Sequence, residues 1–211
     1  MRRRLGSMLG GIIAAAAWYA LALQLSILLR TSTNWAGTLF NFFGYFTILT
    51  NTLVALVLTA PTVPLTGTAR FATPNVRTAA AVYIAIVGIV YVIVLQELWN
   101  PQGAQALADL ILHKLVPILY VGYWLVFEPH GRVRWRAALM WLIYPAIYLA
   151  YSLVRGAMTG WYPYPFLDVG TIGYARVLVQ SGVLLAVFLV MSALVIALDK
   201  AIARRPWPVT D

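Results

Sequence analysis

Six apolar segments, each about 20 residues long, make up most of this 211-residue chain. They lie near residues 9–29, 40–60, 79–98, 104–127, 135–155 and 174–198, and short polar connectors separate them. An α-helix of about 20 residues crosses roughly 30 Å of hydrocarbon. The sequence therefore predicts an all-α polytopic membrane protein, in which residues 1–211 form a single domain of six transmembrane helices.

Composition supports this class. Hydrophobic residues make up 62% of the chain and charged residues 10%, with a mean hydropathy of +0.83. A soluble domain normally carries about 25% charged residues. Cysteine is absent, which excludes disulfides, thiolate nucleophiles and cysteine metal sites.

The formal charge of +9 comes from short basic clusters between the apolar segments. This arrangement is typical of juxtamembrane anchors and argues against nucleic acid as a partner. With six helices, 11 Lys and Arg residues fall on one side of the membrane and 3 on the other, and Lys114 completes the 15. The positive-inside rule then predicts that both termini are cytoplasmic. We expect a protein of the plasma membrane, such as a bacterial inner membrane.

The first apolar segment follows three arginines, an arrangement that also occurs in secretory signal peptides. Its 21 residues are long for a signal peptide and suit a membrane span. We interpret it as an uncleaved first helix, with cleavage as the alternative.

His113 is the ionisable residue that most needs an explanation, because it lies inside the fourth apolar segment. An ionisable group at membrane depth is costly and usually marks a pathway, a partner or a reaction centre. Counting residues from the outer end places Thr47 of the second segment roughly 10 Å deep and His113 at a similar depth. Thr47 shares a helix face with Asn51, and Thr50 lies one step around that helix.

Further polar and aromatic residues occur toward the outer side. Tyr151 and Arg155 belong to a stripe on the fifth segment that ends at the arginine. The loop after it, residues 159–168, contains two prolines and four aromatic residues. Proline fixes φ and prevents a regular helix, so this loop predicts a stiff aromatic lid or, equally, an interfacial anchor.

A hydroxyl beside a base is the pair that nucleophilic catalysis requires. No serine lies in a G-x-S-x-G elbow, and His113 is the plausible base within the membrane. A Thr–His pair is then the most economical reactive pair, with Thr47 and Thr50 competing as nucleophile. One membrane histidine with scattered carboxylates does not provide a three-ligand metal site, and we expect neither metal nor cofactor.

Three features resemble the androgen-inducible-gene family of integral membrane hydrolases and its bacterial relatives. They are the second-segment string from Phe43 to Asn51, His113 with Pro117, and the lid string from Trp161 to Leu167. The resemblance implies a multi-span threonine hydrolase that cleaves fatty acid esters of hydroxy fatty acids. By position, the family's nucleophile falls on Thr47 and its histidine on His113.

The hydrolase hypothesis assigns further roles. Asn51, with Thr50, is the candidate for oxyanion stabilisation or support. Candidates for binding a lipid or fatty acid ester, in a site that opens outward, are Arg155, Tyr151, Trp161, Tyr164 and Asp168.

Two other hypotheses stay open. One is a small transporter or channel that uses His113 and Glu97 as a proton-linked pair, although the sequence shows no internal repeat. The other is a non-catalytic membrane interaction protein in which His113 is structural.

Overall fold

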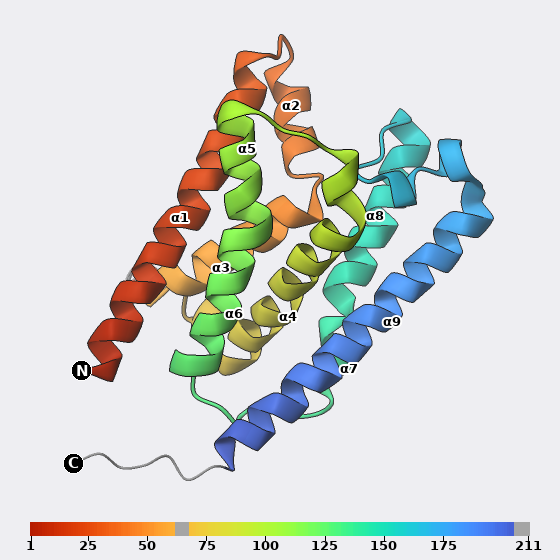
Figure 1. The fold of residues 1–211 in the computed structure, drawn as a ribbon. Helices are drawn as coiled ribbons and strands as arrows, with labels where there is room; N and C mark the ends of the chain where they lie inside the picture. Colours follow the sequence, from red (N-terminus) through yellow and green to blue (C-terminus); the bar gives the residue numbers. More distant parts are fainter. Residues whose placement is uncertain (62–67, 205–211) are drawn as a thin grey trace.

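The computed structural model describes residues 1–61 and 68–204, and every regular element within them is a helix (Figure 1). The α-helices are α1 (Arg2–Arg30), α2 (Trp35–Phe42), α3 (Phe46–Thr59), α4 (Pro74–Val90), α5 (Gly103–Leu110), α6 (Val116–Phe127), α7 (Ala137–Trp141), α8 (Ile143–Thr159) and α9 (Val169–Ala203). The shorter elements are 3₁₀ turns at Thr68–Ala72, Gln96–Leu98 and Pro165–Leu167, and π-helical turns at Tyr91–Leu95 and Ile111–Leu115.

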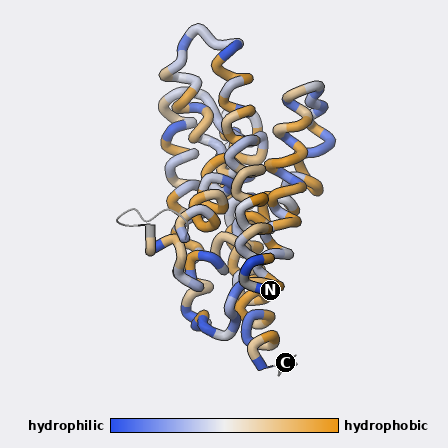
Figure 2. Tube along the Cα trace, turned by 90° about the vertical axis from the view of Figure 1, so that its left-hand side faces the viewer, coloured by the Kyte–Doolittle hydropathy of each residue, from blue (hydrophilic) through white to orange (hydrophobic). Residues whose placement is uncertain are grey.

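Among the described residues, five stretches are long and apolar enough to cross a membrane, and there are six if the bent pair of α2 and α3 counts as one span. The five are Arg4–Arg30, Pro74–Leu98, Gly103–Phe127, Ala137–Thr159 and Val169–Ala203. Each overlaps one of the predicted segments, which confirms the all-helical class and the features of a polytopic membrane protein. In Figure 2 hydrophobic residues are spread along the helices, as contact with lipid requires.

Helix α4 lies near the centre of the bundle (Figure 1). Of the most apolar stretch in the span that begins with α4, 56% is buried, against 22–33% in the other four. Helix α4 packs against α3, α6 and α9, while α1 packs against α3, α5 and α6. Helix α1 begins and α9 ends at the same end of the bundle, and residues 159–168, which we call the lid, lie toward the other end (Figure 1).

The second apolar segment differs from the prediction. A continuous helix was expected near residues 40–60, but α2 ends at Phe42, α3 begins at Phe46, and the two are bent by 74°. Between them Tyr45 is extended, with φ −91° and ψ 130°. The break starts α3 within the packed bundle, so Thr47 is the second residue of a helix and not the middle of one.

Side chains from α8 satisfy the backbone groups that the break leaves without helical partners. The Tyr148 hydroxyl donates to the carbonyl oxygen of Gly44 at 2.9 Å, and Nη1 of Arg155 donates to the carbonyl oxygen of Phe40 at 3.3 Å. Nη2 of Arg155 also donates to the side-chain oxygen of Asn41. Non-helical backbone at membrane depth is tolerated where protein supplies such partners.

The last span also has a break. Gly173 has φ 77° and ψ 156° inside the element α9, so the first turn from Val169 is separate from the long helix that follows. Only glycine adopts such a conformation readily. The predicted span near residues 174–198 therefore begins where the straight helix begins.

At the end of the bundle opposite the lid, buried polar contacts hold the connections. Asp199 accepts hydrogen bonds from the backbone N–H of Gly131 at 3.0 Å and from Nδ1 of His130 at 3.0 Å. Glu128, just after α6, forms an ion pair with Arg77. Burial raises the pKa of Glu128 above its usual value, and the Arg77 guanidinium opposes that shift.

We predict that Gly44→Ala destabilises the protein by about 1–3 kcal/mol, because overpacking has that typical cost. A Cβ atom at position 44 would lie 2.1 Å from Nη1 of Arg155 and 2.9 Å from the backbone oxygen of Asn41. The measurement is the thermal unfolding midpoint in detergent. Gly122→Ala in α6 is the matched control, since no heavy atom lies within 4 Å of its Cβ position. Equal midpoints for the two variants would contradict this account of the break.

Candidate functional site

A cavity of about 390 Å³ contains both residues of the predicted reactive pair. Thr47 reaches it from α3, and His113 reaches it from the π-helical turn between α5 and α6. Its other polar lining residues include Gln24, Gln105, Asp109, Tyr91 and the lid residue Tyr164. The similar depth predicted for Thr47 and His113 thus corresponds to a shared cavity.

The backbone around His113 is irregular for a reason that the sequence contains. Pro117 has no N–H, so the carbonyl of His113 loses the helical donor four residues later. The chain forms a π-helical turn at Ile111–Leu115, in which the N–H of Val116 reaches the carbonyl of Ile111. Gly88 allows α4 to approach this turn, because a Cβ there would lie 3.1 Å from Pro117 and 3.4 Å from the His113 oxygen. Single π turns often occur at functional sites.

Asp109 and Tyr91 hold the His113 imidazole. Nδ1 of His113 lies 3.1 Å from Oδ1 of Asp109, and the Tyr91 hydroxyl donates to Oδ2 of the same carboxylate. The Tyr91 ring stacks on the imidazole, with centroids 4.3 Å apart and planes 16° apart. A carboxylate can only accept, so in the neutral imidazole Nδ1 carries the proton and Nε2 presents a lone pair. In the described part of the chain, Nε2 has no hydrogen-bond partner.

Asp109 and Tyr91 are not among the site residues predicted from the sequence. A signal for Asp109 was present, because a carboxylate four residues before His113 lies on the same helix face. Nothing in the sequence indicated Tyr91, which comes from another span. Its own π-helical turn, Tyr91–Leu95, lies opposite the turn that carries His113, and both turns contribute lining residues to the cavity.

Thr47 has a lid residue as its partner. The Tyr164 hydroxyl lies 3.3 Å from the Thr47 backbone nitrogen, whose N–H it accepts, and 3.3 Å from Oγ1 of Thr47. Desolvation raises the pKa of Tyr164 above its usual value of 10.0, and the hydrogen bonds with Thr47 oppose that shift. Tyr164 therefore keeps its proton at neutral pH and can donate. Among the described residues no hydrogen bond joins Thr47 to His113.

Thr50 and Asn51 are fully buried and do not line this cavity. The hydroxyl of Thr50 lies 3.3 Å from that of Tyr144. Asn51 uses both amide hydrogens, on the carbonyl oxygens of Thr47 at 2.9 Å and Leu112 at 3.1 Å. Asn51 thus ties α3 to the His113 turn and has no free donor for an oxyanion.

Arg155 and Tyr151, expected to bind substrate, lie at the break between α2 and α3. The Arg155 guanidinium carbon lies 4.2 Å from the centroid of the Phe40 ring and 4.0 Å from that of Trp161. The Tyr151 hydroxyl accepts from Nη1 of Arg155 at 3.4 Å. Neither residue lines the cavity. The guanidinium is buried and engaged with protein groups, so its role in this structure is to hold the break.

One part of the lid contacts Thr47, and other residues anchor the lid to the helix bundle. Trp161 packs edge-on against Tyr45, with ring centroids 5.4 Å apart. Asp168 caps the first turn of α9, where its side chain accepts from the backbone N–H and the hydroxyl of Thr171 at 3.2 and 2.7 Å. Of the expected lid residues, Tyr164 is the one that reaches Thr47.

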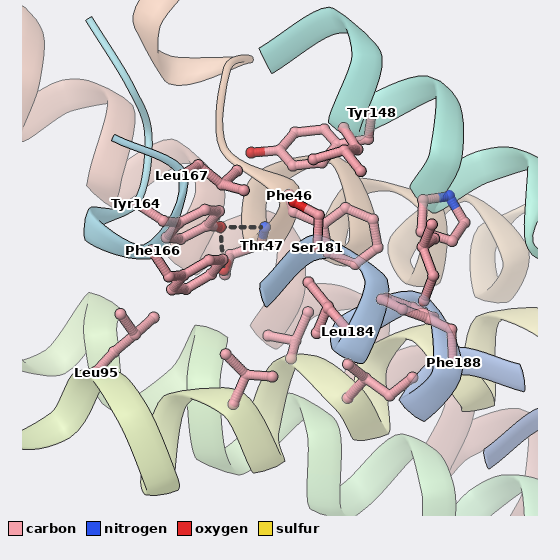
Figure 3. Close-up of a pocket in the computed structure, with 16 residues that line it drawn as sticks. Phe46, Thr47, Leu95, Tyr148, Tyr164, Phe166, Leu167, Ser181, Leu184 and Phe188 are labelled. Carbon is pink, nitrogen blue, oxygen red and sulfur yellow. Dashed lines mark hydrogen bonds between the residues drawn. The ribbon is translucent and has the colours of Figure 1, made fainter. Parts of the chain in front are cut away.

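A second, smaller cavity of about 60 Å³ lies against Thr47 and Tyr164 (Figure 3). Its walls come mainly from Phe46, Tyr148, Leu184 and Phe188, with the buried hydroxyl of Ser181. That hydroxyl has no hydrogen-bond partner among the described residues. Thr47, Tyr164 and Leu95 line both cavities, so the two spaces share this part of their walls.

Glu97, the partner of His113 in the transporter hypothesis, is exposed and does not line the cavity. Among the described residues no group of three His, Cys, Asp or Glu side chains is placed to hold a metal ion.

No protein-family model, curated protein or solved structure matches the chain. We therefore infer function from the geometry of the site.

We predict that the resting imidazole of His113 carries its proton on Nδ1, the tautomer that Asp109 selects. Nitrogen NMR of histidine-labelled protein measures this directly, because the chain has 2 histidines and a His113→Gln sample assigns the signals. Asp109→Asn should alter the tautomer ratio. Tyr91→Phe, which keeps the stacked ring, should preserve it. An Nε2–H tautomer in the unaltered protein would contradict the assignment.

Proposed function

We propose that this protein is an intramembrane lipid-ester hydrolase with Thr47 as nucleophile and His113 as base. The observation that carries the proposal is the shared cavity, which Thr47 lines together with His113, whose imidazole is oriented by a buried carboxylate. A nucleophile, a base and a group that orients the base are the three parts of a triad. The resemblance to the androgen-inducible-gene hydrolases supports the same two residues.

The chemistry would proceed in two halves. Nε2 of His113 accepts the proton of Thr47 as Oγ1 bonds to the ester carbonyl carbon. The bond from that carbon to the alcohol oxygen breaks, and His113 returns the proton to the leaving oxygen. Water, deprotonated by His113, then attacks the acyl-threonine, and Oγ1 regains a proton as its bond to carbon breaks. Catalytic hydrogen bonds are often long without substrate and tighten in the complex.

The start of α3 supplies stabilisation for the oxyanion, in place of the expected Asn51. The N–H of Thr47 is one of the first N–H groups of the helix, which have no partner within it. It lies at the positive end of the helix dipole. The Tyr164 hydroxyl accepts this N–H in the unliganded protein and, once displaced by the ester oxygen, can donate to the same oxyanion. Removing one oxyanion donor typically costs about 10²–10³ in kcat.

The placement of Glu97 weakens the proton-linked transporter, because the pair that this hypothesis named is not formed. A His113 imidazole paired with the buried carboxylate of Asp109 also serves hydrolysis, because the carboxylate orients the base. The hydrolase is therefore the function that uses the most features of the site.

We expect Thr47→Ala and His113→Ala each to lower esterase activity by about 10³-fold or more, because the loss of one member of a catalytic unit costs nearly as much activity as the loss of the whole unit. The assay is hydrolysis of lipid esters by purified protein, together with labelling by a fluorophosphonate probe and mass spectrometry of the adduct. Thr50→Val is the matched control and should keep activity. Full activity of Thr47→Ala, or an adduct on Thr50, would refute the assignment.

We further propose that both termini are cytoplasmic and that the cavity opens outward. The support is the distribution of Lys and Arg, 11 against 3. The protein has no cysteine, so single cysteines can report the topology.

A membrane-impermeant maleimide should label Thr33→Cys in intact cells, and should label Arg134→Cys only after lysis. Both positions are exposed, in the α1–α2 and α6–α7 connections. The reverse pattern would invert the orientation.

A further inference from the structure

The two cavities beside Thr47 differ in chemistry as well as in size. The large one carries His113, Asp109 and the paired amides of Gln24 and Gln105, where Nε2 of Gln105 donates to Oε1 of Gln24 at 2.6 Å. The small one contains no carboxylate, imidazole or amine among its lining residues. An ester bound at Thr47 has two arms, and the two cavities offer them different surroundings.

The position of the base decides which arm enters which cavity. The imidazole that deprotonates Thr47 must also protonate the leaving alcohol oxygen, from within about 2.6–3.2 Å. His113 lines the large cavity and not the small one. The alcohol arm must therefore leave through the large cavity. The acyl arm stays bonded to Oγ1, and the small cavity, which Thr47 also lines, is the space left for it.

The size of the small cavity limits the acyl arm. A single water molecule requires roughly 10–15 Å³ of cavity volume. A cavity of about 60 Å³ therefore holds about four to six atoms the size of a water oxygen. Figure 3 shows Thr47 with Tyr164 on one side of this cavity and Leu184 and Phe188 across it. Leu184, on α9, is half-buried and lies in the wall, while Phe188 is buried and packs against Phe46 and Tyr83.

We propose that the substrate is an ester with a short, apolar acyl arm and a larger alcohol arm that carries polar groups. Leu184 limits the length of the acyl arm, and the Gln24–Gln105 pair contacts polar groups of the alcohol arm. This inference rests on the proposed function and narrows it. A long-chain acyl group, which the family resemblance implies, would have to extend beyond the 60 Å³ of the small cavity.

The first test compares butanoate, octanoate and hexadecanoate esters of p-nitrophenol with purified protein. The unaltered protein should have its highest kcat/KM on butanoate. Leu184→Ala should raise the ratio of octanoate to butanoate kcat/KM about tenfold or more, since one methylene in an apolar pocket can change specificity that much. Leu184→Phe should lower the same ratio. Leu178→Ala is the matched control, because Leu178 is 59% exposed on the same helix.

The second test changes the alcohol arm while butanoate is held constant. Gln105→Leu should shift preference from the glycerol ester toward the octanol ester and leave the acyl-length profile unchanged.

If Leu184 variants keep the original acyl profile while hydrolysis persists, the assignment of the two arms to the two cavities is wrong, but the proposed hydrolase activity stands. If Leu184 variants change alcohol preference instead, the arms are reversed. If the unaltered protein cleaves no ester, the proposed function and this inference both fail.

Discussion

The break between α2 and α3 is the constraint on which the rest of the site depends. Backbone groups inside an apolar bundle must find partners in the protein, because lipid provides none. Tyr148 and Arg155 of α8 supply those partners, and Gly44 leaves the space that the guanidinium occupies. The break in turn places the first turn of α3, with Thr47, against the cavity. A helix start inside the bundle provides N–H groups that a continuous span would have used internally.

A second irregularity faces the first across the cavity. Pro117 removes one helical hydrogen bond and the chain responds with a π-helical turn that carries His113. Tyr91, in a π-helical turn of the neighbouring span, stacks on the imidazole and donates to Asp109. Regular helices would present these side chains at different angles. The polar groups meet because both walls depart from ideal geometry, at the cost of regular hydrogen bonding.

The lid contacts the site through Tyr164, whose hydroxyl lies against both the backbone N–H and the hydroxyl of Thr47. The anchoring of the lid is separate, through Trp161 on Arg155 and the Asp168 cap of α9. Tyr162 packs so closely on Gly156 that a Cβ there would lie 1.9 Å from the ring.

The sequence by itself determined the class of fold, because apolar segments of membrane-spanning length leave few alternatives. The sequence also indicated Thr47 and His113 as candidate site residues, because polar groups are conspicuous in apolar segments. Only the tertiary structure decided their partners: Asp109 and Tyr91 for the histidine, Tyr164 for the threonine, and backbone carbonyls for Asn51. The break before α3 likewise depends on Arg155, more than 100 residues away. Hydropathy reports how deeply a residue lies, whereas the direction and partner of its side chain follow from packing between helices that are distant in sequence.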